Sequence, residues 1–502
     1  MPIGFDFGTS NTVWAHSVKG GGSLAVARRF LSKETLEDGV SDWVASLAAY
    51  QGSRFYKGGA WVRRHAEQLA QEGCRIEKSV KTRLRGMTGQ DALDGCNPWA
   101  GTTEGEAASD IIGHACDVDD APDWTQEQTV ATHPFGASAS YRLGLRRTLE
   151  RLDFQVAYYL CEPTAALLSF QASRTHARAP RLRHCLVFDW GGGTLDVSVV
   201  RVGHGKFLEV SSAGCDIAGD RIDEIIFLDM IERGSLADIP DGSAEDALKI
   251  QAERVKVQLS TFDVVEDIRP YGDASKKYSI TRERFHELFR RDILRPILET
   301  VEKALGGLRR EQIDEVFMVG GSSNLPAIRD ELRRLFPGRV TWHPKPEDGQ
   351  SAIAEGAAAA LALGARPFLA WGLVTWAPNG APCTLLPPGL SWDELVRGEP
   401  KRLQFFLTDL NATEISIPLG YQVDGVDGRA GEARLLKALR LPAPKMARTR
   451  GCWEPFEIEI KGQSDGTLVV SAGLAGPNFA RKQVSIDDAP WGLLFESAEA
   501  VN

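Results

Sequence analysis

Two short stretches of the chain share one pattern of apolar and polar positions. In each, an apolar run is interrupted by an aspartate, passes into glycine and small polar residues, and is followed by a second apolar run. They read GFDFGTSNT from Gly4 and LVFDWGGGTLDVSVV from Leu186. Each pattern predicts a β-strand that enters a tight turn and returns as a second strand. Asp6 and Asp189 take equivalent places, so we expect two copies of one hairpin.

A third pattern predicts a strand that leads through a turn into a helix. EVFMVGGSSNLPAIRDELRRLF runs over residues 315–336, and its apolar start is followed by Gly320, Gly321 and Ser322. After this turn, the apolar positions fall on one helical face. A glycine pair at such a junction lets a planar or anionic ligand lie against the helix N-terminus. Alone, it is as typical of close strand–helix packing. The apolar positions are Ile328, Leu332, Leu335 and Phe336.

Beyond Gly364 the helical periodicity gives way to short apolar runs separated by Pro, Gly and Asn. The stretch FEIEIKGQSDGTLVVSA, residues 456–472, predicts a β-hairpin. RLQFFLTDLNATEISIPLGYQV, residues 402–423, predicts two strands joined by a turn at 409–411. The spacing of turns predicts an all-β domain of about 130 residues. We therefore expect a first domain over 1–365 and a second over 366–502.

Composition excludes several classes of partner and site. Hydrophobic content of 43% and charged content of 25% are ordinary for a globular protein. A net charge of −10 argues against nucleic-acid and anionic-membrane partners. None of the eight cysteines stands in a CxxC pair, which disfavours a metal site or a disulfide framework. No apolar run reaches the roughly 18 residues that span a bilayer, and no signal peptide is visible, so we expect a cytoplasmic location.

The two predicted hairpins suggest a site for a polyphosphate. Successive turn amides form a concave anion site, and an adjacent carboxylate suits a hydrated hard cation. Two such turns facing each other would hold one polyphosphate from both sides, with magnesium between them. A single glycine-rich hairpin would be unremarkable; the repetition, with Asp6 and Asp189 before each turn, favours the paired site. The Walker pattern GxxxxGK[ST] and a GxGxxG after a strand are both absent.

Together these stretches resemble motifs of the heat shock protein 70 (DnaK-type) chaperone family, within the actin-like ATPase superfamily. The two hairpins and VGGSSNLP resemble its phosphate and adenosine motifs. The resemblance implies an α/β, two-lobed actin-like ATPase domain with a ribonuclease-H-like duplicated fold, followed by a smaller all-β sandwich that binds peptide. Four further stretches resemble family segments: CEPTAALLSF at 161–170, AGDRID at 218–223, ERVKVQLS at 253–260 and EGAAAALALG at 355–364.

The resemblance also implies roles for individual residues. Asp6 and Asp189 match the carboxylates that hold magnesium through water. With these two, the residues that match the catalytic set are Glu162, Thr194 and Asp196. The residues that match nucleotide-binding positions are Gly8, Thr9, Ser10, Asn11, Gly191, Gly192, Gly193, Thr194, Gly219, Glu253, Lys256, Ser260, Gly320, Gly321, Ser322 and Asn324. Pro134 and Arg142 match the pair through which the family passes the nucleotide signal outward.

The chain departs from the family in its site residues. Where the family presents a catalytic lysine, the nearest stretch is YKGGAWVRRHAEQ, which places Arg63 or a neighbour there. Arginine keeps the charge but cannot lose its proton, so altered turnover is expected. Val257 and Asn324 stand where two arginine stems sandwich adenine, so looser stacking is expected.

The chain also departs from the family in its linker and its last segment. The family's leucine-rich linker is replaced by LGARPFLAWG, residues 363–372. The sequence ends at Asn502, without room for a helical lid or an acidic EEVD-type tail. The expectation is a short, lidless, bacterial-type member.

The function expected from the resemblance is an ATPase chaperone. Its cofactors would be ATP or ADP with Mg²⁺, and its partners unfolded or extended polypeptide, with J-domain and nucleotide-exchange co-chaperones besides. Alternatives stay open: a cytoskeletal actin-like filament ATPase, a sugar kinase, or a nucleotide-sensing scaffold with little hydrolysis. The β-domain could equally be a structural accessory. Fold resemblance alone does not decide among these.

Overall fold

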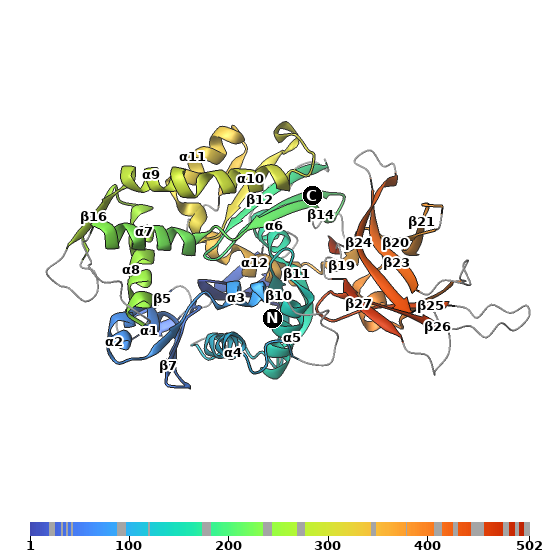
Figure 1. The fold of residues 1–502 in the computed structure, drawn as a ribbon, viewed down its shortest axis with the longest axis horizontal. Coiled ribbons are helices and arrows are strands. Elements are labelled where there is room, and N and C mark those ends of the chain that lie inside the picture. The colour runs from blue at the N-terminus through green and yellow to red at the C-terminus, as the bar shows by residue number, and fades with distance from the viewer. Residues whose placement is uncertain are drawn as a thin grey trace, which may run out of the picture.

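The computed structural model describes most of the chain (Figure 1). The described residues are 1–19, 26–31, 34–36, 39–41, 44–87, 97–118, 121–172, 182–233, 243–268, 277–342, 348–377, 379–405, 414–424, 430–442, 456–474, 481–486 and 491–495.

A mixed six-stranded sheet, the first sheet, forms the early part of the molecule. Its strands are β1 (Ile3–Phe7), β2 (Asn11–Lys19), β3 (Val26–Leu31), β6 (Val44–Ala45), β10 (Gln128–His133) and β11 (Gln155–Cys161). The order is β11-β10-β1-β2-β3, with β6 paired to β2. β1 and β2 form an antiparallel hairpin, whereas β10 and β11 join in parallel. Smaller sheets are made by β4 (Glu34–Leu36), β5 (Gly39–Ser41), β7 (Ala48–Gln51), β8 (Arg54–Gly58) and β9 (Arg75–Glu77).

A seven-stranded sheet, the second sheet, repeats this order. Its strands are β12 (Arg183–Trp190), β13 (Leu195–Gly203), β14 (Lys206–Cys215), β17 (Glu315–Val319), β18 (Val340–Trp342), β19 (Arg366–Leu369) and β28 (Trp491–Leu494). The succession β18-β17-β12-β13-β14 has the same arrangement as β11-β10-β1-β2-β3. Asp6 and Asp189 each stand one residue before the end of the first strand of their hairpin. The predicted hairpin repeat is therefore confirmed at the level of strand topology.

Helices cover both sheets. In the first half they are α1 (Gly59–Arg64), α2 (Ala66–Gln71), α3 (Val80–Gly86), α4 (Thr103–Cys116), α5 (Ala139–Arg151) and α6 (Glu162–Ala172). In the second they are α7 (Gly219–Arg233), α8 (Ser243–Leu259), α9 (Arg282–Asp292), α10 (Leu294–Ala304), η1 (Arg310–Gln312), η2 (Gly321–Asn324), α11 (Pro326–Leu335) and α12 (Asp348–Ala362). A hairpin of β15 (Val264–Ile268) and β16 (Tyr278–Thr281) extends this half. The predicted strand–turn–helix is confirmed as β17, η2 and α11, whose Ile328, Leu332 and Phe336 are fully buried.

Helix α12 packs closely against the first sheet and against α6. It contacts β1, β2 and β10 of that sheet. A Cβ added at Gly4 would overlap the backbone of α12 at Ala354 and Ala358, and one added at Gly356 would overlap the backbone of α6 at Ala165. The alanine-rich sequence of α12 follows from this, because only small residues let backbones approach so closely. Its first turn is thereby fixed beside the turns of both sheets.

The later part of the chain is all β, as expected from its turn spacing. One four-stranded sheet has β20 (Gly372–Trp376), β21 (Pro382–Leu386), β23 (Glu414–Asp424) and β24 (Ala430–Pro442). The other has β22 (Lys401–Phe405), β25 (Phe456–Gly462), β26 (Leu468–Leu474) and β27 (Lys482–Ile486). The π-helical turn η3 (Asp393–Arg397) precedes β22. One apolar core joins residues of both sheets. We call residues 371–486 the β-rich part.

The β-rich part contains one predicted hairpin and one predicted pair of strands joined by a turn. Strands β25 and β26 pair in antiparallel from Phe456–Leu474 to Gly462–Leu468, which confirms the first. The two strands of the other stretch are present as β22 and β23, but they do not pair with each other: β22 pairs with β25, and β23 pairs with β20 and β24. The turn expected at 409–411 lies outside the described residues.

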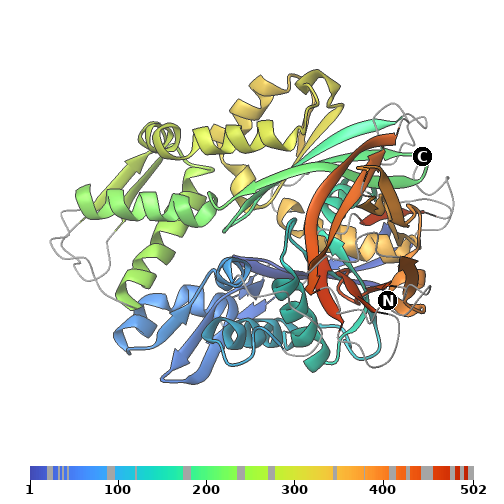
Figure 2. The ribbon, with the colours of Figure 1, turned by 45° about the vertical axis from the view of Figure 1, so that its right-hand side comes forward.

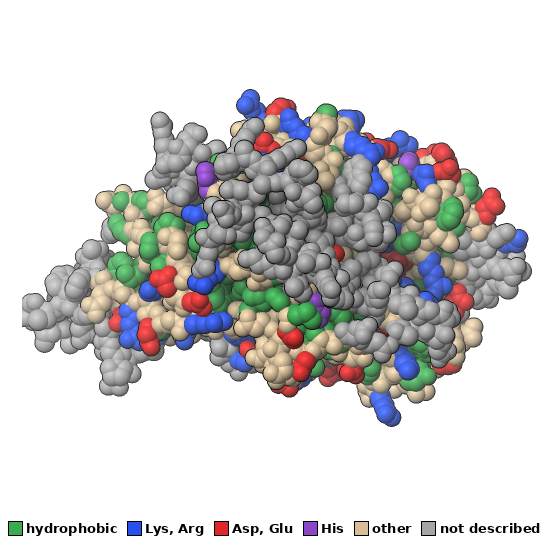
Figure 3. All heavy atoms as spheres, turned by 180° about the vertical axis from the view of Figure 1, so that it is seen from behind, with side chains coloured by type: hydrophobic (Ala, Val, Ile, Leu, Met, Phe, Trp, Pro, Cys, Tyr) green, Lys and Arg blue, Asp and Glu red, His purple; other side chains and the backbone are tan. Residues whose placement is uncertain are grey.

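The expected division at 365/366 is crossed by two strands. β19 and β28 extend the second sheet beyond β14, so two segments from the expected second domain complete a sheet of the first. In Figure 2 the β-rich part lies across one end of the α/β part. The face in Figure 3 carries interspersed acidic and basic side chains among its described residues. Within the described part of the chain, no helix has the length and apolarity to cross a membrane.

Candidate nucleotide site

A cavity of about 460 Å³ lies where the turns of the two sheets meet the first turn of α12. Both predicted phosphate turns contribute to it, as do α8 and the turn after β17. Most of the residues expected from sequence line this cavity. They are Asp6, Gly8, Thr9, Ser10, Asn11, Glu162, Asp189, Gly191, Gly192, Thr194, Glu253, Lys256, Ser260, Gly320, Gly321, Ser322 and Asn324. The remaining expected residues do not line the cavity; they are Gly193, Gly219, Asp196, Pro134 and Arg142.

The two phosphate turns face each other. A Cβ at Gly192 would overlap the Ser10 side chain, and one at Gly193 would overlap Thr82 and approach Thr9. Glycine is therefore required here by close approach of the two turns. The Gly219 amide donates to the Gly191 carbonyl (3.1 Å), so the start of α7 supports the second turn from behind.

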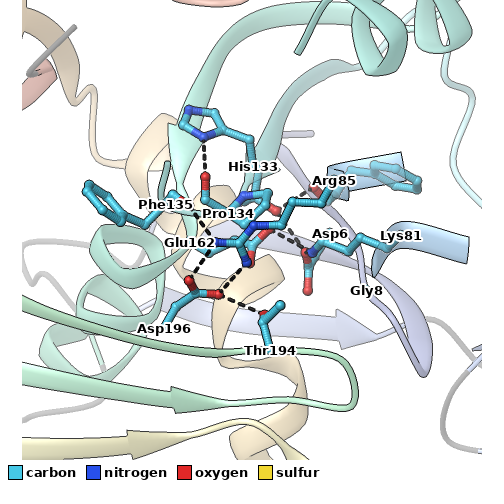
Figure 4. Close-up of polar contacts among 12 residues, drawn as sticks. Asp6, Gly8, Lys81, Arg85, His133, Pro134, Phe135, Glu162, Thr194 and Asp196 are labelled. Atoms are coloured by element: carbon cyan, nitrogen blue, oxygen red, sulfur yellow. Dashed lines mark hydrogen bonds and ion pairs between the residues drawn. The ribbon is translucent and has the colours of Figure 1, made fainter. Parts of the chain in front are cut away.

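Lys81, on the short helix α3, supplies a buried cation at the floor of the cavity (Figure 4). Its Nζ lies 2.8 Å from Glu162 Oε1 and 3.8 Å from Asp6 Oδ1. Burial lowers the pKa of Lys81, but these two carboxylates outweigh it and hold the pKa above its usual value. The structure places Lys81, and not Arg63, beside the carboxylates of Asp6 and Glu162. Arg63 lines the outer cavity, where it donates to the Ser10 carbonyl and pairs with Glu253 at 3.4 Å.

A second cation, Arg85, holds Asp196 in place. Its guanidinium donates two hydrogen bonds to the Asp196 carboxylate (3.0 and 3.1 Å) and one to the Phe135 carbonyl (3.0 Å). The Thr194 hydroxyl donates to Asp196 Oδ2 at 2.8 Å. Figure 4 shows this chain of contacts running from α3 to the second turn. Asp196 is thus oriented from two sides, and it fixes the hydroxyl of Thr194.

The cavity floor carries more negative than positive charge. Burial raises the pKa of Glu162 to about 7, because the opposing effect of Lys81 does not cancel it. Burial also raises the pKa of Asp189 well above its usual range, and the carboxylates of Glu162, Asp196 and Asp6 add to the shift. The Thr132 hydroxyl donates to Asp6 Oδ1 at 2.9 Å and orients that carboxylate. Among the described residues, no three acidic, histidine or cysteine side chains are close enough to bind one metal ion directly, so these carboxylates fit Mg²⁺ only through its bound water.

The residues expected at the ribose and adenine form a polar wall. Lys256 pairs with the buried carboxylate of Asp223 at 2.8 Å and donates to the Gly219 carbonyl. Ser322 Oγ donates to the Gly191 carbonyl at 2.7 Å, which ties the adenosine turn to the phosphate turn. Val257 is 60% exposed and offers no flat surface.

Two further contacts at the cavity were missed from sequence. Asn11 Nδ2 donates to Gln350 Oε1 at 3.1 Å, so the first phosphate turn is tied to α12. Asn324 Oδ1 accepts from Arg329 Nη2 at 2.6 Å. Gln350 carried no motif signal, because it reaches the site only through the packing of α12.

Parts of the chain are similar to known chaperones. Residues 154–364 match the family model described as Hsp70 protein. A chaperone protein dnaK from Guillardia theta is 29% identical over 361 residues, which cover 66% of this chain and 56% of the relative. The chaperone protein DnaK 3 of a Synechococcus species is 32% identical over 251 residues, covering 46% and 37%. The chaperone protein HscA of Cronobacter sakazakii is 31% identical over 242 residues, covering 47% and 37%.

Residues 154–364 are therefore similar to the Hsp70 family, and a longer stretch of the chain is similar to a DnaK chaperone. The chain spans between 37% and 56% of the lengths of these relatives. Of the expected signalling pair, Arg142 lies close to Gly466 in the turn between β25 and β26. Arg142 is only 4% exposed, and its neighbour one turn on, Arg146, meets the β25–β26 turn. Arg146 donates to Ser464 Oγ at 3.0 Å, and its Nε lies 3.6 Å from Asp465 Oδ2.

Proposed function

We propose that this protein is a Mg²⁺-dependent ATPase and an Hsp70-like molecular chaperone that binds extended apolar segments of unfolded proteins. The observation that carries the proposal is the pair of facing glycine turns above a buried cluster of carboxylates and Lys81. In this proposal the two sheets are the lobes of an actin-like, ribonuclease-H-like duplicated ATPase domain. The β-rich part is a β-sandwich that binds peptide.

Phosphoryl transfer to water depends mainly on positioning and on neutralising charge. Asp6 and Asp189 would hold the magnesium ion through water, and the ion would neutralise phosphate charge. The backbone amides of Gly8–Asn11 and Gly191–Thr194 would cradle the phosphates. Glu162, with its raised pKa, would orient and accept a proton from the attacking water, and Lys81 would stabilise charge on the terminal phosphate.

Peptide binding follows a different chemistry. An extended peptide meets a β-sandwich through main-chain hydrogen bonds, with apolar side chains in alternate pockets. Binding is expected to be modest, in the micromolar range or weaker, with fast exchange. Unfolded polypeptide, J-domain proteins and nucleotide-exchange proteins are the proposed partners, and the cytoplasm the proposed location.

Hydrolysis and peptide binding are tested separately. Single-turnover hydrolysis by Asp189→Asn and Thr194→Ala variants is expected to fall by a factor on the order of 10²–10³ each, with near-normal circular dichroism. Unchanged hydrolysis in both would remove the catalytic assignment. Anisotropy of a labelled apolar heptapeptide, with ATP or ADP, tests the chaperone part; no binding by the full chain would remove it. A filament-forming ATPase would instead sediment in the presence of ATP.

A further inference from the structure

The last described strand of the chain lies inside a sheet of the α/β part. β28 pairs with β14 through Lys206–Leu494 and Phe207–Leu493, and on its other side with all four residues of β19. β14 and β19 make no ladder with each other. β19 therefore joins the second sheet only through β28.

Side chains of β28 and of the residue that follows it are buried on one face of the sheet. Leu493 is 1% and Phe495 is 3% exposed, and both belong to the core shared with α6 and α12. The rings of Phe495 and Phe207 lie 5.5 Å apart, and the Phe495 amide donates to the Gly205 carbonyl at 2.9 Å. By contrast, Leu494 is 37% exposed. An alternating apolar strand with main-chain pairing is how a sheet edge binds an extended segment.

Gly492 fits the middle of this arrangement closely. A Cβ at Gly492 would overlap Leu208 Cδ2 and Phe368 Cε1 and lie 3.0 Å from the Phe207 carbonyl oxygen. Phe368 belongs to β19 and Phe207 to β14, so the glycine brings both neighbours close at once.

The same strand holds the β-rich part. Trp491 Nε1 donates to the Gly466 carbonyl at 2.7 Å, in the turn between β25 and β26. The Trp491 ring lies 5.3 Å from that of Trp392, next to η3. One five-residue segment, Trp491–Phe495, thus contacts β14, β19 and the β-rich part.

We propose that the edge of β14 is a strand-acceptor site, and that its ligand is this chain's own segment Trp491–Phe495. The class of ligand is an extended segment with a glycine at the point of closest approach and apolar side chains directed into the core. Bound there, it carries β19 and holds the β-rich part on the second sheet. The proposal goes beyond the chaperone function. It is tested by hydrogen exchange at β14, so its outcome does not depend on whether the protein hydrolyses ATP.

The test compares amide hydrogen exchange in three full-length proteins. In Gly492→Val, the added side chain cannot be accommodated, so exchange at residues 206–207 and 366–369 is expected to rise by at least about tenfold. Leu494→Asn is the matched control on the same strand, and its exchange there is expected to stay within about twofold of wild type. Residues 183–190, in the middle of the second sheet, report whether the variant is folded. If residues 183–190 lose protection in Gly492→Val, that variant is replaced by Leu493→Ser. The serine removes an apolar contact without adding bulk.

Addition of a synthetic peptide with the sequence of residues 489–497 completes the test. It is expected to restore protection at 206–207 in the Gly492→Val protein, whereas the same peptide with valine for Gly492 is not. Equal exchange in the glycine variant and the control would overturn the proposal. So would failure of the wild-type peptide to restore protection.

Discussion

At the scale of single residues, the buried cation Lys81 is the strongest candidate for a mechanistic test. Its Nζ is the only side-chain nitrogen of the described chain that is shown within 4.0 Å of both Asp6 and Glu162. Lys81→Met is expected to lower the single-turnover rate of ATP hydrolysis by about 10²–10³, because a preorganised charge at the phosphate is lost. Lys303→Met, on the exposed face of α10, is the control. An unchanged rate in Lys81→Met would contradict a role of Lys81 in hydrolysis and leave it a structural role only.

A second residue, His133, is expected to make the free energy of unfolding depend on pH. Burial lowers the pKa of His133 well below its usual range, and the charges of Arg142 and Lys81 lower it further. The unfolded chain binds a proton below about pH 6.5 and the folded chain does not, so stability falls as the pH falls through 6.5. Between pH 7.5 and 5.5, wild type is expected to lose about 1 kcal/mol more than His133→Asn. Asparagine keeps a donor for the Pro134 carbonyl, to which His133 Nδ1 lies at 3.0 Å. Urea unfolding at the two pH values measures the difference; parallel losses would contradict it.

The residue scale also shows where sequence reasoning succeeds and fails. Asp6 and Asp189 could be found because each stands inside a local motif whose turn fixes its surroundings. Lys81 could not, because it is joined to Glu162, 81 residues away, only by the packing of α3. Its short helix lacks a glycine turn or any other local signal. Arg63 was favoured because its stretch of sequence is the nearest to the place of the family's catalytic lysine. Its side chain does line the outer cavity.

At the scale of elements, a glycine in α12 and a glycine in α4 show whether packing or helix propensity decides the effect of an alanine substitution. Gly356 has no room for a Cβ, because Ala165 of α6 occupies that space. Gly356→Ala is therefore expected to destabilise the protein by about 1–3 kcal/mol, although alanine is the better helix former. Gly113, inside α4, has nothing within 4 Å of an added Cβ. Gly113→Ala is expected to stabilise by about 0.5–1 kcal/mol. Chemical denaturation checks both, and effects of the same sign would show that packing does not set the outcome.

Strand pairing sets the limit of prediction at this scale. The β25–β26 hairpin was predictable because a short Gly-containing turn joins the two strands directly and brings them side by side. β22 and β23 were predictable as strands, but they pair with strands other than each other: β22 with β25, and β23 with β20 and β24. The pattern of apolar positions says which face of a strand is buried, not which strand lies beside it. The insertion of β28 beside β14 is the extreme case, since nearly three hundred residues separate the paired strands.

At the scale of the whole molecule, the proposed function depends on the contact between α5 and the β-rich part. Arg146 and Asp465 are 6% and 3% exposed, and they lie one helical turn from Arg142, which is expected to relay the nucleotide state. Any docking that changes with nucleotide must form or break this buried polar contact. Because the same turn is held by Trp491, two elements far apart in the sequence converge on one small loop.

Reversing the two charges tests this contact. Arg146→Glu and Asp465→Arg each leave a buried charge beside one of like sign, which is expected to cost about 3–5 kcal/mol of docking free energy. Small-angle scattering of the full chain should then show a larger radius of gyration, as the β-rich part separates. The double variant restores opposite charges, so it is expected to recover much of the compact form; Arg147→Glu, on the exposed side of α5, is the control. If the single variants stay compact, the contact between Arg146 and Asp465 is not needed to hold the two parts together. If they separate and the double variant does not recover, the turn is held by shape and not by charge, and a signal from Arg142 would need another route to the β-rich part.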